Sequence, residues 1–202
     1  MGKIILNGIT YGGGSGGGAS TELTAYDYAE FNGGSYIALP LTVDADYKIT
    51  VDFYIPNYVH NMGVIGTNQT GSSRLHLTEY NNKWYASTGN GEQAFNKSLT
   101  GRHIFVNNVG GKNTFDGDAV TNYTPTTLSS HRLAIGTSQG SATTFFRGKI
   151  YSYKIESIAS GDVILDIIPA QLKIDDYIIK EGLFDTISKR FYESTAILIG
   201  ND

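Results

Sequence analysis

The feature that most constrains the fold is the strict alternation of apolar and polar residues from 48 to 55. In an extended chain every second side chain points to the same side, so this segment has one apolar and one polar face. Such a period of two predicts a β-strand that is buried on one side only. The apolar face consists of Ile49, Val51, Phe53 and Ile55.

Similar short segments recur along the chain, separated by turn-forming residues. Asn81-Asn82 predicts a hairpin turn, and residues 186–189 predict another. The further segments expected as strands are residues 36–39, 62–66, 74–80, 83–87, 103–107, 132–136, 147–155, 163–168 and 196–199. The last of these is expected to close the sheet near the N-terminal strand, and a single helical turn is expected within residues 171–176. Many short strands with Gly and Asn turns predict an all-β antiparallel sandwich or jelly roll.

The 202 residues suit one all-β domain, expected at residues 21–202, with two short segments before it. Residues 12–20 are almost entirely Gly and Ser and predict a flexible linker, either natural or artificial. Residues 1–11 contain a short apolar strand. We expect this segment to be a docking arm that adds to the sheet edge of another chain.

The charge and composition exclude several functions. A formal net charge of −4, with no run of Lys and Arg, argues against binding to nucleic acid or to an anionic membrane. The chain has no cysteine, which excludes disulfides, cysteine-ligated zinc and a thiol nucleophile. The apolar run after Met1 is too short for a signal peptide, and no segment is long enough to span a bilayer. A soluble protein without an export signal is expected.

The last third of the chain contains sequence blocks whose order and spacing resemble a known family. These blocks are residues 145–155, 166–170, 182–186 and 190–192. They resemble the C-terminal half of laminin-G-like, concanavalin A-like jelly-roll domains, in a version common in phage and prophage structural proteins and in bacterial surface proteins. Phe115-Asp116-Gly117 resembles the turn of that family's middle hairpin. The resemblance implies an antiparallel β-sandwich with a short N-terminal arm.

The same resemblance implies a non-enzymatic bacteriophage virion protein, such as a decoration, fibre or adhesion subunit. Such a protein would be present in many copies or as a homo-oligomer and would bind cell-surface or mucosal glycans through avidity. Residues 1–18 would anchor it to other virion proteins. Two alternatives remain open. One is a carbohydrate-binding module at the bacterial cell surface, and the other is a structural capsid or tail protein without a ligand.

No catalytic motif is present, so we do not expect an enzyme. Glucanases of the concanavalin A-like kind resemble one another in a Glu-x-Asp-x-x-Glu strand, which places two carboxylates on one face. Glu22, Asp27 and Glu30 do not have this spacing. The chain also lacks the Gly-x-Ser-x-Gly nucleophile elbow and the helical histidine pair that binds zinc.

Aromatic side chains on the polar faces of the expected strands are the candidate glycan contacts. Sugar C–H faces stack on aromatic rings, while sugar hydroxyls need polar partners. Trp84 and Tyr85 are adjacent in one strand, so one ring should be buried and the other exposed. The candidate ligand-binding residues are Trp84, Tyr85, Tyr54, Tyr80, Arg74 and His76. For each of them the alternative is an ordinary core-packing or solvent-exposed role.

Two pairs of aspartates are candidate calcium ligands, and no other cofactor is expected. Calcium takes about six to eight oxygen ligands, so clustered Asp residues in loops favour it. The pairs are Asp44 with Asp46 and Asp116 with Asp118. Asp also forms ordinary turns, so a purely structural role is the alternative.

Overall fold

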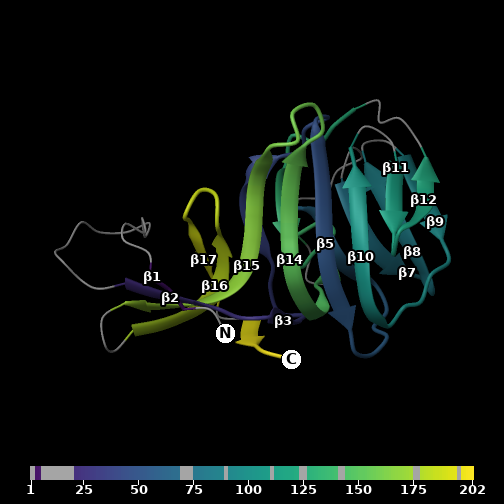
Figure 1. Ribbon diagram of the computed structural model, residues 1–202. Helices are drawn as coiled ribbons and strands as arrows, with labels where there is room; N and C mark the ends of the chain where they lie inside the picture. The colour runs from purple at the N-terminus through teal and green to yellow at the C-terminus, as the bar shows by residue number, and fades with distance from the viewer. Residues whose placement is uncertain are drawn as a thin grey trace.

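The computed structural model describes residues 3–5, 21–68, 75–88, 91–109, 112–122, 127–140, 144–174, 178–194 and 197–202. Their strands pair into two antiparallel sheets (Figure 1). The larger sheet has the order β1 (Lys3–Ile5), β2 (Thr21–Ala25), β15 (Val163–Ile174), β14 (Arg147–Ser157), β5 (Tyr47–Ile55), β10 (Gly101–Asn108), β11 (Lys112–Phe115) and β12 (Asp118–Asn122). Attached to it are β3 (Tyr28–Asn32), β16 (Ile178–Asp185), β17 (Phe191–Glu193) and β18 (Ile197–Gly200).

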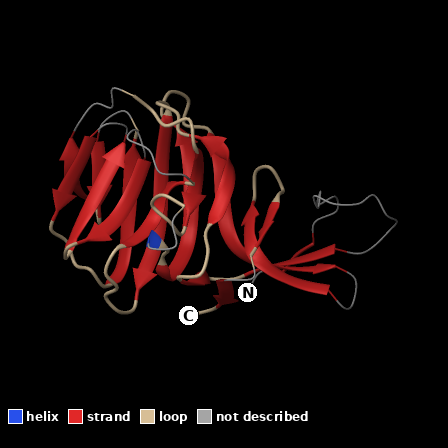
Figure 2. Cartoon of the chain, turned by 180° about the vertical axis from the view of Figure 1, so that it is seen from behind, coloured by secondary structure: helices blue, strands red, loops and turns tan. Residues whose placement is uncertain are grey.

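The smaller sheet packs behind the larger one and faces the viewer in Figure 2. Its order is β4 (Ile37–Thr42), β13 (Arg132–Ile135), β6 (Met62–Thr67), β7 (Leu75–Tyr80), β8 (Lys83–Thr88) and β9 (Gly91–Phe95). Among the residues that the structure describes, no helix has the length and apolar character needed to cross a bilayer.

The main hydrophobic core lies between the two sheets and confirms the alternation seen in the sequence. All four apolar residues on the inner face of β5 are fully buried. The ring centroid of Phe53 lies 5.8 Å from that of Trp84 in the smaller sheet and 6.1 Å from that of Phe115 in the larger one. Burial of each such ring contributes roughly 2 kcal/mol to stability. The expected all-β antiparallel sandwich is therefore confirmed.

The predicted hairpin turns are also confirmed. Asn81 and Asn82, between β7 and β8, have φ angles of 51° and 60°, and Asp116 and Gly117, between β11 and β12, have φ angles of 53° and 84°. Positive φ at both central residues is the signature of a type I′ turn, whose twist matches that of the flanking strands. Residues 186–189 lie in the loop between the paired strands β16 and β17.

β15 is longer than the sequence predicts. It does not end at residue 168 but continues to Ile174, where a helical turn was expected. Residues 170–174 pair with β2 on one side and with β16 on the other, and pairing on both sides satisfies the backbone groups in an extended conformation. The helical-turn prediction is therefore wrong up to residue 174, and residues 175–177 lie outside the described residues. This part of β15 extends beyond the sandwich (Figure 1) and carries a small core of Leu23, Leu172 and Phe184.

The N-terminal strand pairs within its own chain. Lys3–Ile5 pairs with β2 of the same chain, with Ile4 opposite Leu23. It therefore forms an edge strand of the larger sheet, and docking of this segment to another chain stays a prediction. The remainder of the expected arm and linker lies outside the described residues. Attachment to other virion proteins through residues 1–18 stays a prediction.

The C-terminal strand β18 pairs with β3, with Ile197 opposite Phe31, and not with the N-terminal strand. β3 and β15 in turn flank different halves of β14, along residues 147–150 and 153–156 respectively. The residues after β18 consequently lie near the middle of β14, where the strand paired with β14 changes from β3 to β15. This arrangement corrects the expected position of residues 196–199.

Candidate functional site

Trp84 and Tyr85 point to opposite faces of β8, as the alternation along a strand requires. Trp84 is fully buried, and its Nε1 donates a hydrogen bond of 2.8 Å to the carbonyl oxygen of Ser98. Tyr85 is half-buried on the outer face of the smaller sheet. The expectation of one buried ring is confirmed by Trp84, while Tyr85 is half-buried rather than exposed. Trp84 cannot contact a surface ligand, which corrects its place among the candidates.

A pocket of about 250 Å³ lies beside Tyr85 on this outer face. Its lining residues are Asn61, Thr78, Tyr80, Tyr85, Glu92, Ser138, Gln139 and Thr144. The ring centroid of Tyr80 lies 6.2 Å from that of Tyr85 and 5.5 Å from that of His60. The side chain of Tyr80 is 46% exposed. The structure thus brings two of the candidate residues, Tyr80 and Tyr85, to one pocket.

One wall of the pocket is the loop between β13 and β14, which crosses the outer face of β6. Gly63 and Gly66 permit this crossing because they lack a Cβ atom. A Cβ atom at position 63 would stand 2.1 Å from the amide nitrogen of Ser138, and one at position 66 would stand 2.4 Å from its carbonyl oxygen. A hydrogen bond of 3.2 Å between the hydroxyls of Thr137 and Thr144 holds the two ends of this loop together. Glycine within a strand is typical of such a close approach by another backbone segment.

The opposite wall contains Asn61, which is positioned by a buried carboxylate. Glu79 is fully buried and accepts hydrogen bonds of 2.9 Å from the amide nitrogens of both Asn61 and Asn82. It also accepts one of 3.2 Å from the hydroxyl of Tyr58. Bonds to a charged acceptor are stronger than neutral ones, so Glu79 fixes the loop after β5 against the β7–β8 hairpin.

His76 lies behind the pocket and not in solvent. Its side chain is 1% exposed, and its Nε2 is 3.1 Å from Oε2 of Glu92. The contact between His76 and Glu92 follows from the register of β7, β8 and β9, which places His76 opposite Ser87 and Ser87 opposite Glu92. The expectation of a surface position for His76 is therefore wrong. His76 contacts Glu92, which lines the pocket.

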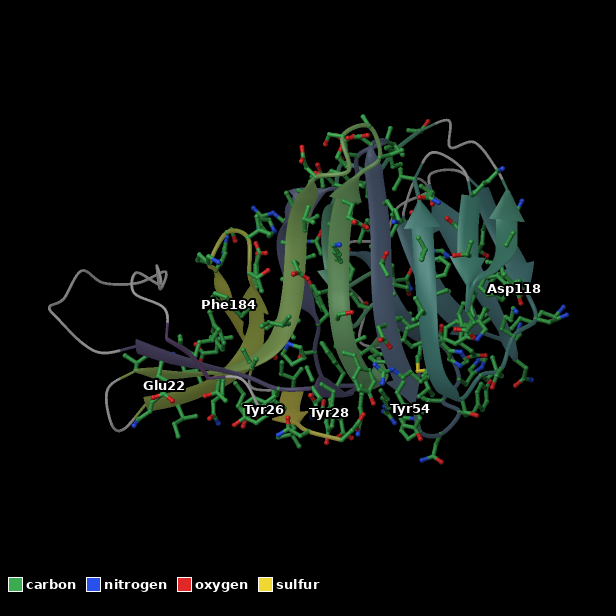
Figure 3. All side chains as sticks on the ribbon, viewed as in Figure 1. Glu22, Tyr26, Tyr28, Tyr54, Asp118 and Phe184 are labelled. Atoms are coloured by element: carbon green, nitrogen blue, oxygen red, sulfur yellow. The ribbon has the colours of Figure 1, made fainter. Side chains whose placement is uncertain are left out.

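Tyr54 lies on the other side of the sandwich, on the outer face of the larger sheet (Figure 3). Its cross-strand neighbours are Arg102 on β10 and Lys149 on β14. Tyr54 cannot therefore share a small ligand with Tyr80 and Tyr85. The last candidate, Arg74, lies outside the described residues.

Asp44 and Asp46 stabilise turns. Asp44 Oδ1 accepts a hydrogen bond of 2.9 Å from the amide nitrogen of Asp46. The carboxylate of Asp46 accepts bonds from the hydroxyl of Ser157 and from the amide nitrogen of Ala159, the latter at 2.8 Å. These bonds, that of Ser157 first, lower the pKa of Asp46. Asp46 thus ties the turn before β5 to the turn between β14 and β15.

Asp116 and Asp118 also have protein partners. Asp116 accepts a hydrogen bond of 2.8 Å from Nδ1 of His103 and one of 2.9 Å from the amide nitrogen of Ile104. Asp118 accepts a bond from Lys97, which lowers the pKa of Asp118. Within the described ranges, no three His, Cys, Asp or Glu side chains are grouped so that they could hold a metal ion. Calcium binding at either aspartate pair stays a prediction.

The pocket combines ring faces with hydrogen-bonding groups. Asn61 and Gln139 carry amides, which can donate and accept, and Glu92 is the one carboxylate among the lining residues. Among the described residues that line the pocket there is no Lys or Arg. This chemistry suits a neutral ligand with an apolar face and several hydroxyls.

Sequence reasoning missed Asn61, Ser138 and Gln139, because all three lie outside the segments predicted as strands. One signal could have identified the loop. Gly63 and Gly66 occur within an otherwise apolar strand, which indicates that another backbone segment approaches there. The identity of that segment is set by tertiary structure and could not be predicted.

The fold has a counterpart among solved structures. The structure of domains LG4-5 of the mouse laminin alpha1 chain matches 88% of this chain with a TM-score of 0.54 and 15% sequence identity. The chain covers 46% of the length of that structure. At this identity the likeness shows the fold alone, which is a laminin-G-like, concanavalin A-like β-sandwich. No protein-family model matches the chain, and no curated protein matches it significantly.

Proposed function

We propose that the protein is a non-enzymatic binding protein that holds a neutral saccharide in the pocket beside Tyr80 and Tyr85. The observation that carries this proposal is the gathering of two partly exposed tyrosine rings, two amides and one carboxylate around one pocket. The C–H face of a sugar would stack on a ring, and its hydroxyls would donate to Glu92 and pair with the amides. A volume of about 250 Å³ suits a ligand smaller than the drug-sized molecules that fill pockets of roughly 300–1,000 Å³.

The charge of the lining favours a neutral ligand and binding without hydrolysis. The carboxylate of Glu92 lines the pocket, so an acidic sugar would meet a like charge there. Hydrolysis of a glycosidic bond ordinarily uses two carboxylates about 5–9.5 Å apart. The lining residues that the structure describes supply one carboxylate, Glu92, which favours recognition over catalysis.

We further propose that the protein acts in many copies on the surface of a phage virion, as a decoration, fibre or adhesion subunit. The C-terminal sequence blocks support this location through their resemblance to such proteins. A small open pocket binds one sugar weakly, and many copies on one particle would convert weak binding into firm attachment. The alternative is a carbohydrate-binding module of a bacterial surface protein, which would use the same pocket.

Binding of the full chain to a glycan array and to whole bacteria tests the proposal. Tyr80→Ala and Tyr85→Ala remove the two rings, and Tyr54→Ala is the matched control because it removes a tyrosine from the other sheet. We expect saturable binding to neutral glycans that both pocket variants lose and the control keeps. The absence of any binding by a folded wild-type protein would instead support a structural virion protein without a ligand.

A further inference from the structure

A second hollow lies on the opposite side of the molecule, on the outer face of the larger sheet. The pairing of β14 with β5 slips by one residue between Ile150 and Ser152, at the point where β14 changes its other neighbour from β3 to β15. This β-bulge directs Tyr151 and Ser152 outward, while Ile150 and Tyr153 on either side are buried. Bulges of this kind re-aim side chains and are frequent beside binding sites.

The hollow at the bulge measures about 470 Å³. Its lining residues are Tyr26, Asp27, Asp52, Arg102, Tyr151, Ser152 and Asp202. Figure 3 shows Tyr26, Tyr28 and Tyr54 along the same rim of the larger sheet. Two of the lining residues, Tyr26 and Tyr151, carry aromatic rings.

One cation, Arg102, lines the hollow at the bulge, a second, Lys149, lies beside it, and both are held on ring faces. The guanidinium carbon of Arg102 lies 3.8 Å from the ring centroid of Tyr151, and Lys149 Nζ lies 3.6 Å from that of Tyr28. Arg102 also donates two hydrogen bonds, of 3.0 and 2.9 Å, to the carboxylate of Asp52. Cation–π contacts and a paired guanidinium group fix both cations in place.

A carboxylate already occupies the donors of this hollow. Asp202 Oδ1 accepts a hydrogen bond of 2.8 Å from Lys149 Nζ, and Asp202 Oδ2 accepts one of 2.7 Å from the hydroxyl of Tyr151. These bonds raise the pKa of Lys149 and lower the pKa of Asp202. The side chain of Asp202 is nevertheless 47% exposed, so solvent and solutes reach this position.

We propose that Lys149, Tyr151 and Arg102 form a second binding site for the carboxylate of a sugar acid, in which the side chain of Asp202 is an internal stand-in for the ligand. The ligand carboxylate would take the place of the Asp202 carboxylate on Lys149 and Tyr151, so the exchange would not leave the cation without a partner. Lys149 and Tyr151 then donate to the ligand as they donate to Asp202. The tyrosine rings along the rim provide stacking surface for the sugar ring.

Calorimetric titration of the full chain with trigalacturonate tests this site. The fully methyl-esterified trisaccharide is the matched control, because it keeps the rings and hydroxyls but lacks the free carboxylates. We expect Asp202→Ala to bind the acid about tenfold more tightly than the wild type, since the competing carboxylate is gone. Lys149→Met and Tyr151→Phe should each weaken acid binding by about tenfold, and binding of the ester should not respond to Asp202→Ala.

The sign of the Asp202→Ala effect decides the proposal. Unchanged or weaker acid binding in Asp202→Ala, in a protein with wild-type circular dichroism, would overturn it, and so would equal gains for acid and ester. This site is independent of the pocket on the smaller sheet. Tyr85→Ala should leave acid binding unchanged, and Lys149→Met should leave neutral-glycan binding unchanged, so either proposal can fail alone.

Discussion

Gly63 and Ser138 are in direct backbone contact, because a Cβ atom at position 63 would stand 2.1 Å from the amide nitrogen of Ser138. Ser138 belongs to the loop that forms one wall of the pocket beside Tyr85. The shape of the pocket therefore depends on a residue that does not line it. Any side chain at position 63 would have to push the loop off the sheet.

Gly63→Ala should displace this loop, weaken saccharide binding and lower the free energy of unfolding by about 1–3 kcal/mol through overpacking. Gly117→Ala is the control, because a Cβ atom there meets nothing within 4 Å and only its φ of 84° is strained, at a cost of about 1 kcal/mol. Urea unfolding and saccharide titration of both variants check this. Wild-type affinity in Gly63→Ala would contradict the account of the loop.

Glu79 and Glu92 are expected to respond in opposite ways to the same substitution. Glu79→Gln removes a buried charged acceptor and introduces a donor among the donors that face it, so it should destabilise the fold by about 1–3 kcal/mol. Glu92 is 44% exposed, so Glu92→Gln should change stability by less than about 0.5 kcal/mol while it weakens saccharide binding. Chemical denaturation and binding assays separate the two effects. The reverse pattern would place the ligand elsewhere.

Trp84 should affect stability and not recognition. Trp84→Ala should cost about 3–5 kcal/mol because it empties the centre of the core and leaves the carbonyl oxygen of Ser98 without its donor. Trp84→Phe should retain most of the packing and wild-type saccharide affinity. Thermal unfolding with parallel titration of both variants checks this, and a stable Trp84→Phe protein that no longer binds would contradict the core assignment.

Stability should fall at alkaline pH because of Tyr151. Burial first, and then the hydrogen bond to Asp202, raise its pKa from 10.0 to about 12. The folded state holds this proton more tightly than the unfolded state, so the stabilisation is complete below pH 10 and is lost as the pH rises through about 12. Tyr153 is fully buried, and burial raises its pKa in the same direction.

Urea midpoints measured across this window should fall with rising pH, and they should fall less in Tyr151→Phe. The difference in phenolate absorbance between the wild type and Tyr151→Phe reports the titration of this tyrosine directly. A difference signal that is complete by pH 10 would contradict the hydrogen bond between Tyr151 and Asp202.

The layers of the fold could be predicted from sequence because they follow from local patterns. The alternation in residues 48–55 and the Asn81-Asn82 turn each determine their own conformation, and the structure contains both. The strand at residues 170–174 could not be predicted in this way. It is extended because β2 and β16 pair with it on both sides, and β2 is distant in the sequence.

The candidate site was predictable only in part, for the same reason. Alternation placed Trp84 and Tyr85 on opposite faces, but it could not decide which face is the core. Tyr54 and Tyr80 have the same local pattern and nevertheless lie on different sheets. His76 falls on an outward-facing position and is nevertheless buried, and β9 places Glu92 in contact with it, which local alternation could not predict.

The most direct test of the saccharide site is chemical-shift mapping of the isotope-labelled protein, with the best neutral glycan from the array as the ligand. The account predicts that the perturbed signals gather on the smaller sheet, at Asn61, Tyr80, Tyr85, Glu92 and Gln139. Signals that instead gather around Tyr54 and Tyr151 on the larger sheet, or that do not shift at saturating glycan, would contradict it.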